Sequence, residues 1–295
     1  MTRWLVALGV LVATVLGLEG VARVFLRTHW NTSDLQEQLG RRSIKSLIEF
    51  DGNPAVMYRL RRDLDTEFME SRVVTDDAGV RVASRDVAAR DGGIRIAMFG
   101  DSTPFGWRVP YAESYGEKLR AELESATHAA VVLRNFSVPG YNAAQELEVL
   151  RPALASFRPN LVILHHDHND WQPTGFGYGG WLPPEYGDNA LHSALLKLVL
   201  RQIKKGRDKR IPVPEKTDGE FVGEYCAGGP RYEAMMEIRR AFLEAARAEG
   251  VPVLVVIFDS DAPADEHYET SERYVRLHKQ AADRFQAMGY LVFDI

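Results

Sequence analysis

The chain has 295 residues, of which 45% are hydrophobic and 26% charged, and this composition is ordinary for a globular protein with a sizeable core. Lysine and arginine number 36 against 41 aspartate and glutamate residues, so the net charge of −5 argues against nucleic-acid binding. A single cysteine, Cys226, excludes an internal disulfide and the common structural zinc sites, and we predict a protein without metal or cofactor.

The first predicted element is an apolar helix at the N-terminus. An uncharged stretch over residues 4–18 continues as an apolar run to Leu26 that only Glu19 and Arg23 interrupt. The extended run is long enough to cross a bilayer, and no Ala-x-Ala-like cleavage site ends it. We therefore predict that residues 1–27 are an uncleaved single-pass membrane anchor with the remaining chain on the periplasmic side. A cleaved signal peptide, which would leave a secreted protein, and a buried soluble helix are the alternatives.

A polar segment follows the apolar helix. Residues 28–92 contain short apolar pieces separated by turn signals such as Asp51-Gly52-Asn53-Pro54 and Asp77-Ala78-Gly79. We predict a connector that carries a few short strands and turns and packs against the main domain.

From Ile94 onward, apolar strands alternate with amphipathic helices. The predicted strands are Ile94–Phe99, Val131–Val138, Leu161–His166, Val253–Phe258 and Tyr290–Ile295. The predicted helices are Ala112–Ser125, Ala143–Phe157, Tyr232–Glu249 and Ser271–Met288, and Asn142 with Gln145 forms a capping-box pattern at the start of the second. This alternation predicts an α/β fold over residues 93–295, a three-layer sandwich with a mainly parallel five-stranded sheet and helices on both faces.

One long insertion, residues 171–231, interrupts the alternation. Its first part, up to Tyr186, is rich in aromatic residues and glycine, and a helix is predicted at Leu191–Ile203 before the basic run 204–210. A long loop after a strand is well placed to act as a lid or substrate wall, with a plain surface loop as the alternative. The basic run is predicted to be a solvated helix end, with contact to lipid headgroups or an anionic polymer as the alternative.

Three of the predicted strands end in loops that carry polar residues. Ser102 follows the first strand in a Phe-Gly-Asp-Ser turn, Gly140 follows the second, and the third runs into His-His-Asp-His-Asn-Asp, which contains Asn169. Open α/β sheets bind ligands at the carboxyl ends of their strands. Taken alone, the first loop is also explained by an ordinary strand-to-helix turn, with a helix beginning near Tyr111.

Together the three loops fit a serine nucleophile that attacks an ester. Such a nucleophile needs hydrogen-bond donors where negative charge develops on the carbonyl oxygen. We predict that the backbone N–H groups of Ser102 and Gly140 and the side-chain amide of Asn169 supply them. Because Gly140 has no Cβ, the backbone there can approach a ligand closely.

These three loops resemble the first three sequence blocks of the GDSL, or SGNH, hydrolases. The resemblance covers residues from about 75 to 295 and is closest to bacterial members that carry an N-terminal membrane segment. It implies the flavodoxin-like SGNH-hydrolase fold, a nucleophile at Ser102 and an oxyanion hole formed by Ser102, Gly140 and Asn169. The sequence departs from the family at Asp167, which stands where the Gly-x-Asn-Asp block has its glycine.

A second departure from the family concerns the catalytic base. The Asp-x-x-His block, which supplies the base and its orienting carboxylate after the last strand, is not found in this sequence. The sequence stops at Ile295, within the strand expected to precede that block, so we expect the native chain to continue with the catalytic Asp and His. Without them Ser102 is predicted to be nearly inactive, because an unactivated serine is a poor nucleophile.

Four further residues are predicted to line the pocket: Asp101, His168, Asp170 and Trp171. Asp101 is expected to shape the turn rather than to transfer a proton, and His168 is the best substitute for the base. A metal site formed by His166, His168 and Asp170 is an alternative that lacks a second cluster of ligands.

The sequence therefore predicts an exported serine hydrolase that cleaves carboxylic esters through an acyl-enzyme on Ser102. Its substrate is expected to be a small-molecule or polysaccharide ester, either an O-acylated envelope carbohydrate or a lipid-like ester. An O-acyltransferase using the same site is one alternative, and a membrane-tethered binding protein without catalysis is another. A nucleotide-binding domain ranks last, because the sequence has neither a Gly-x-Gly-x-x-Gly motif after the first strand nor a P-loop.

Overall fold

The structure, a computed structural model, describes the backbone of residues 2–38, 44–83, 93–167, 170–171, 193–196, 198–199, 229–257 and 272–294. The side chains of residues 2, 3, 5, 26–38, 45, 272–278 and 294 are outside this description. The chain divides into two compact units, the first comprising residues 1–43 and 175–215 and the second residues 44–174 and 216–295. The segment boundaries predicted at residues 27 and 92 stay predictions.

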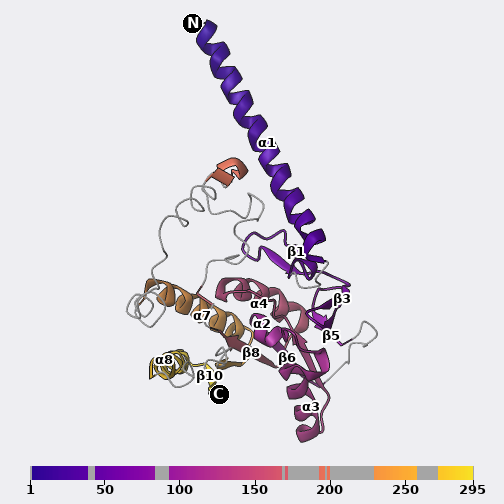
Figure 1. Cartoon of the computed structure of the whole chain (residues 1–295). Helices are drawn as coiled ribbons and strands as arrows, with labels where there is room; N and C mark the ends of the chain where they lie inside the picture. The colour runs from indigo at the N-terminus through magenta and orange to yellow at the C-terminus, as the bar shows by residue number, and fades with distance from the viewer. Residues whose placement is uncertain are drawn as a thin grey trace. The chain divides into compact units, whose positions relative to one another are not determined.

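The first unit contains the N-terminal helix α1, Thr2–Gln38 (Figure 1). Its segment Val6–Phe25 has a mean hydropathy of 1.8 and is only 6% buried, so it is long and apolar enough to cross a membrane. This confirms the predicted apolar helix, which is compatible with either an anchor or a signal sequence. Residues 194–196 and 198–199 are also helical and lie within the helix predicted at Leu191–Ile203.

The second unit is built on an eight-stranded sheet of order β10-β9-β8-β6-β7-β5-β4-β3 (Figure 1). Its parallel strands are β6 Ile94–Phe99, β7 Val131–Asn135, β8 Leu161–His166, β9 Val253–Ile257 and β10 Leu291–Asp294. These are the five predicted strands. The connector adds the antiparallel strands β3 Asp65–Phe68, β4 Ser71–Thr75 and β5 Arg81–Val82, so the sheet is wider than predicted. A separate hairpin pairs β1 Ile48–Phe50 with β2 Tyr58–Leu60.

Helices cover both faces of the sheet, which confirms the predicted three-layer α/β sandwich. One face packs against α4 Ala143–Phe157, α7 Pro230–Ala248 and α8 Glu272–Met288 through a large apolar cluster. The other face packs against α3 Tyr115–Thr127. Alternate residues of each strand point to opposite faces, so Ala97 joins the first cluster and Ile96 the second.

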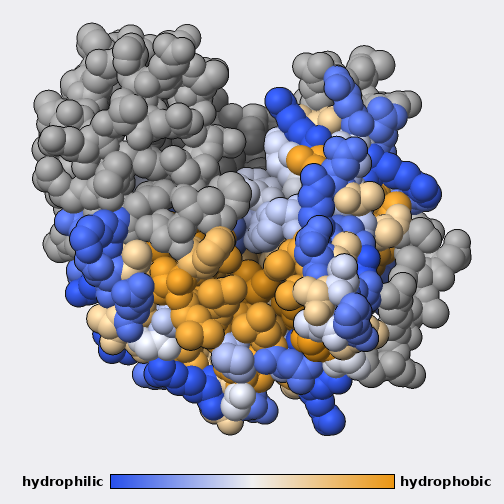
Figure 2. Space-filling view, turned by 90° about the horizontal axis from the view of Figure 1, so that it is seen from below, coloured by the Kyte–Doolittle hydropathy of each residue, from blue (hydrophilic) through white to orange (hydrophobic). Residues whose placement is uncertain are grey.

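The described residues cover the apolar surface of the second face only in part. Among the helices that the structure describes, α3 alone packs there, and it lies over β6 and β7. Leu291 and Phe293 of β10 are 58% and 55% exposed, in register with Leu254 and Val256 of β9. Figure 2 shows apolar surface gathered in the middle of the molecule's face as seen from below.

Local hydrogen bonds explain where the elements begin and end. The predicted capping box of α4 is present: the Asn142 side chain accepts from the Gln145 N–H, and the Gln145 side chain accepts from the Asn142 N–H. Strand β7 ends at Asn135 rather than at Val138, because the Asn135 side chain accepts from the Ser137 N–H at 3.1 Å and turns the chain.

Candidate active site

Ser102 is the first residue of a helix. Gly100 follows strand β6 with φ at +152°, and a Cβ there would lie 2.5 Å from Pro104 Cγ and 2.9 Å from His165 Cβ, so only glycine fits. The Asp101 side chain then accepts from the Thr103 N–H at 3.2 Å and caps the four-residue helix α2, Ser102–Phe105. The expectation that the first helix after the strand begins near Tyr111 was therefore wrong.

The Ser102 side chain is half-buried, and its hydroxyl donates to Asp101 Oδ2 at 3.3 Å. Its N–H points out of the first turn of α2, and none of the residues with described positions accepts a hydrogen bond from it. The N–H is thus available to an anionic ligand atom, and Asp101 has the turn-shaping position expected of it.

The second loop is fastened directly to the first. The Val138 N–H donates to Gly100 O at 3.3 Å, and Asn135 Nδ2 donates to Pro104 O at 2.5 Å. Gly140 lies at the exposed tip with φ at +78°. Within the described part of the chain, no group accepts from the Gly140 N–H.

The third loop contacts both of the others. The Ala143 N–H at the start of α4 donates to Asp170 O at 3.2 Å, and Thr103 Oγ1 donates to Asp167 Oδ2 at 3.5 Å. The three strand ends therefore meet at one edge of the sheet. Asn169 and His168 lie outside the described residues, so the oxyanion roles of Ser102, Gly140 and Asn169 stay predictions.

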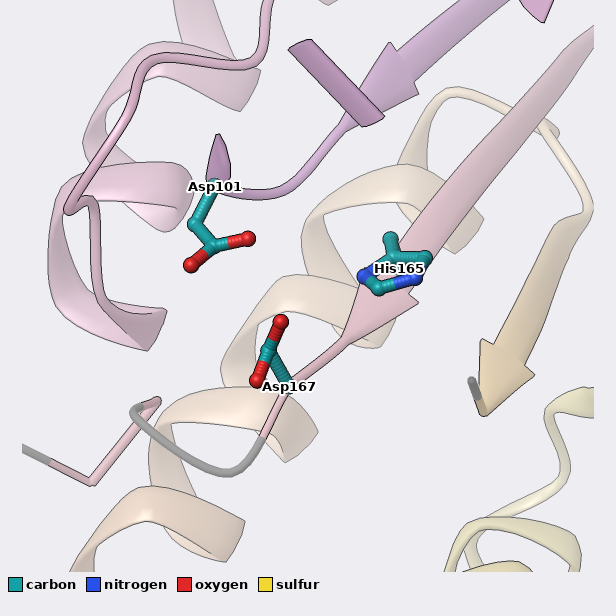
Figure 3. Close-up of side chains that lie close together, drawn as sticks. All are labelled: Asp101, His165 and Asp167. Carbon is teal, nitrogen blue, oxygen red and sulfur yellow. The ribbon is translucent and has the colours of Figure 1, made fainter. Parts of the chain in front are cut away.

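The side chains of Asp101, His165 and Asp167 lie close together, and Asp101 is the residue before Ser102 (Figure 3). All three are buried, and their ligand atoms lie within 4.8 Å of one another. Burial lowers the pKa of His165 to about 4, so this imidazole is neutral at physiological pH. One imidazole and two carboxylates are a ligand set that a divalent cation can use, but three of the carboxylate oxygens already accept hydrogen bonds from Ser102 and Thr103. The expectation of a metal-free site stays a prediction.

A buried ion-pair network holds the third loop from behind. Arg239 of α7 is fully buried and pairs with Asp170 and, at 2.5 Å, with Glu146 Oε2 of α4. Asp170 Oδ2 also lies 2.5 Å from His166 Nδ1. Asp170, predicted to line the pocket, is therefore committed to structural partners through Oδ2, whereas its Oδ1 accepts no hydrogen bond from the described residues. Because His168 lies outside those residues, the alternative His166–His168–Asp170 metal site stays untested.

Burial raises and the Arg239 guanidinium lowers the pKa of each of the two carboxyl groups in this network. Burial raises the pKa of Glu146 to about 8, although Arg239 opposes the shift. For Asp170, burial would also raise the pKa, but Arg239 and His166 outweigh it and hold the pKa below its ordinary value. The network therefore contains one firmly ionised carboxylate, Asp170, paired with Arg239.

The remaining pocket prediction concerns Trp171. This side chain is half-buried and packs against the large apolar cluster, with the guanidinium carbon of Arg231 5.7 Å from the centre of its ring. Trp171 therefore packs partly in the core, and its role in lining the pocket stays a prediction.

Two buried arginines support the site and were not predicted from the sequence. Arg239 lies on the apolar stripe of α7, between Met235 and Phe242, and a charge on such a stripe was the available signal. Arg81 of β5 donates to the carbonyl groups of Phe105, the last residue of α2, and of Gly106 and Val109, which follow it. For Arg81 no local sequence pattern gave a corresponding signal, because its burial is seen only in the structure.

Comparison with known proteins gives one family match. The model of the GDSL-like Lipase/Acylhydrolase family matches residues 98–292, and no curated protein matches the chain. Solved structures similar to the chain include the psychrotrophic esterase EstA from Pseudoalteromonas sp., with 13% identity, a TM-score of 0.38 and coverage of 68% of this chain and 76% of that one.

Two further solved structures give comparable values. The SGNH-hydrolase family esterase AlinE4 is 17% identical, with a TM-score of 0.39 and coverage of 69% and 77% of the two chains. A member of the lipolytic protein G-D-S-L family from Veillonella parvula is 14% identical, with a TM-score of 0.38 and coverage of 68% and 77%.

Proposed function

Because the chain belongs to the GDSL-like lipase/acylhydrolase family, whose members are ester-hydrolysing serine hydrolases, we propose that Ser102 is its nucleophile. In the first step the Ser102 Oγ bonds to the carbonyl carbon of a carboxylic ester, the bond from that carbon to the alkoxy oxygen breaks, and the proton lost by the serine hydroxyl ends on the departing alcohol. Water then attacks the acyl-enzyme and releases the acid. The observation that carries the proposal is the position of Ser102 at the first turn of α2, where its N–H has no acceptor among the described residues and lies beside the Gly140 loop.

Backbone groups supply the proposed stabilisation of the oxyanion. The N–H groups of Ser102 and Gly140 are without acceptors among the described residues, and both loops are tied to the end of strand β6. The Asn169 amide is proposed as the third donor. Each such donor contributes about 3–4 kcal/mol to transition-state stabilisation.

Asp101 is given a positioning role in this mechanism. Its two oxygens accept from the Ser102 hydroxyl and from the Thr103 N–H, so it fixes both the side chain and the backbone of the nucleophile. Because His165 is neutral, it adds no positive charge to the site. Its side chain packs against Gly100.

The substrate proposed is an ester outside the cytoplasm, either an O-acylated envelope carbohydrate or a lipid-like ester. Support comes from α1, which is apolar enough to tether the hydrolase domain to a membrane, and from the aromatic residues of the insertion. Aromatic rings stack on sugars and pack on acyl chains, so they suit both classes.

Covalent labelling tests the nucleophile. In a full-length protein that supplies the catalytic base, a fluorophosphonate probe is expected to modify Ser102, identified by peptide mass spectrometry, and Ser102→Ala should remove the label. Ser156→Ala, which changes an exposed serine of α4, is the matched control and should label as the parent does. Labelling at another residue, or a Ser102→Ala protein that labels unchanged, would contradict the proposal.

Product analysis tests the substrate class. Release of acetate from an acetylated polysaccharide, or of fatty acid from phospholipid vesicles, distinguishes the two ester classes. Transfer of the acyl group to an added polysaccharide acceptor, faster than its release to water, would show an O-acyltransferase instead.

A further inference from the structure

The first unit contains a carboxylate in an unexpected place. Glu19 lies within the apolar segment Val6–Phe25 of α1, where a charged side chain is costly if lipid surrounds it. It is six residues from Phe25, which at the helical rise of 1.5 Å per residue is about 9 Å inside the apolar end. The segment itself is about 30 Å long, the thickness of the hydrocarbon layer.

A distant part of the chain satisfies this carboxylate. The backbone N–H groups of Ala194 and Leu195 donate to Glu19 at 2.9 and 3.0 Å, and the Ser193 hydroxyl donates at 2.7 Å. Arg23, one turn along α1, donates to the same carboxylate at 2.8 Å. Glu19, on another helix, thus acts as the N-terminal cap of the helical residues that begin at Ala194.

Apolar packing accompanies these hydrogen bonds. Ala22 of α1 and Ala194 are 4% and 0% exposed where they meet, and Leu195 and Leu198 pack around them. Val21 and Val24 on other sides of α1 are 67% and 65% exposed, and Val199 is 46% exposed. The short helix therefore covers one side of α1 and leaves apolar side chains of both helices open.

We propose that Ser193–Val199 is a second membrane-contacting element, docked on α1 through Glu19 in the outer part of the leaflet from which the chain emerges. The bilayer covers the open apolar side chains of both helices. The basic run 204–210 begins five residues after Val199 in the sequence, as suits a surface with anionic headgroups. The proposal rests on the anchoring of α1 but not on ester hydrolysis.

The same contact makes α1 part of the mature fold. A cleaved signal peptide is removed from the protein, and its loss would leave Ser193 and the first N–H groups of the short helix without their acceptor. The structure thus favours a retained anchor over a cleaved signal. The insertion would then be a second attachment to the membrane, because residues on both sides of it belong to the hydrolase domain.

Fluorescence quenching in vesicles tests the element. The full chain with Val199→Cys in a Cys226→Ser background is labelled with an environment-sensitive fluorophore and reconstituted in phosphatidylcholine–phosphatidylglycerol vesicles. Lipids with a nitroxide near the headgroup should lower its intensity by about twofold, since an interfacial helix lies at that depth. Aqueous iodide should quench it far less than a label at Asn53→Cys, an exposed turn position.

Variants of Glu19 test the docking contact. Glu19→Ala should make the Val199 label accessible to iodide and insensitive to lipid nitroxides, whereas Glu237→Ala, which removes an exposed carboxylate of α7, should change neither. Glu19→Gln keeps an acceptor oxygen and should retain part of the lipid quenching.

A label at Leu11→Cys reports insertion of α1 separately, because this exposed residue lies in the middle of the apolar segment. Lipid quenching at Leu11 together with iodide quenching at Val199 would overturn the second element while leaving the anchor and the ester chemistry intact. A membrane-derived protein whose N-terminus begins after Phe25 would overturn the retained anchor.

Discussion

At the scale of single residues, the site depends on one glycine. Gly100→Ala is expected to lower the free energy of unfolding by about 3 kcal/mol, because overpacking and an unfavourable φ act together there. Gly52→Ala, at an exposed position with open space around its Cα, should change it by less than about 0.5 kcal/mol. Denaturant titration of both variants checks the difference. If the two variants changed the free energy of unfolding equally, Pro104 and His165 would be able to move away from the added methyl group at position 100 without cost.

A second residue-scale prediction concerns Glu146 and pH. Its carboxyl group has a pKa of about 8 in the fold against 4.5 as a free group, so between these values the folded chain holds a proton that the unfolded chain has lost. The stability this gives is fully present below pH 4.5, falls as pH rises and is gone above pH 8.

The variant Glu146→Gln removes this titration and still places a polar side chain beside Arg239. Its free energy of unfolding, compared with that of the parent at the same pH, should be higher at about pH 9 than at about pH 5, because only the parent loses stability as Glu146 deprotonates. Urea unfolding of both proteins across this range measures the change. A constant difference between them would contradict the raised pKa.

At the scale of elements, the connector strand β5 braces the segment after the nucleophile. Arg81 donates three hydrogen bonds to the carbonyl groups of Phe105, Gly106 and Val109, and its guanidinium lies 4.7 Å from the centre of the Phe105 ring. Burial lowers the pKa of Arg81 to about 10, yet the group remains charged at neutral pH. A connector that only linked two domains would have no such contact.

Removing this brace should loosen the nucleophile's surroundings. Arg81→Met is expected to cost about 3 kcal/mol, because buried carbonyl groups lose their donors. It should also speed amide hydrogen exchange in the segment that follows α2. Arg72→Met on the neighbouring strand β4, whose arginine is exposed and pairs with Asp65, should have little effect. Exchange rates in that segment that match the parent would show that Arg81 does not hold it.

Local sequence patterns predicted most of the second unit. The parallel strands, α4 with its capping box and the three polar loops follow from hydrophobic periodicity and turn residues within a few positions of one another. The strands of the connector were missed as parts of the main sheet because they are two to five residues long. Their pairing also depends on one contact, Arg81 with Asn135, between segments far apart in the sequence.

The residues that support the site were missed because their partners also lie far away in the sequence. Arg239 could be singled out as a charge on an apolar stripe, but its partners Glu146 and Asp170 are 93 and 69 residues away. No periodicity links such positions. The residues expected to do chemistry follow strand ends, which are visible in sequence, whereas those that hold them in place are defined only by the packed fold.

At the scale of the whole molecule, the second face of the sheet should drive association. The exposed Leu291 and Phe293 lie on β10, the last strand of the described sheet, beside Leu254 and Val256, and apolar surface next to a sheet edge is prone to self-contact. Replacing Leu291 and Phe293 together by lysine should weaken concentration-dependent association in detergent by about tenfold or more, since two charges would then need desolvation.

The neighbouring residue Val292 provides the control. It points to the opposite face and packs against the large apolar cluster, so Val292→Lys should lower stability rather than association. Sedimentation velocity at several concentrations, with thermal unfolding of each variant, separates the two effects. If the double lysine variant associates as the parent does, the contact lies elsewhere. If it dissociates while unfolding at the parent's temperature, this face of β9 and β10 is the surface through which copies of the chain meet.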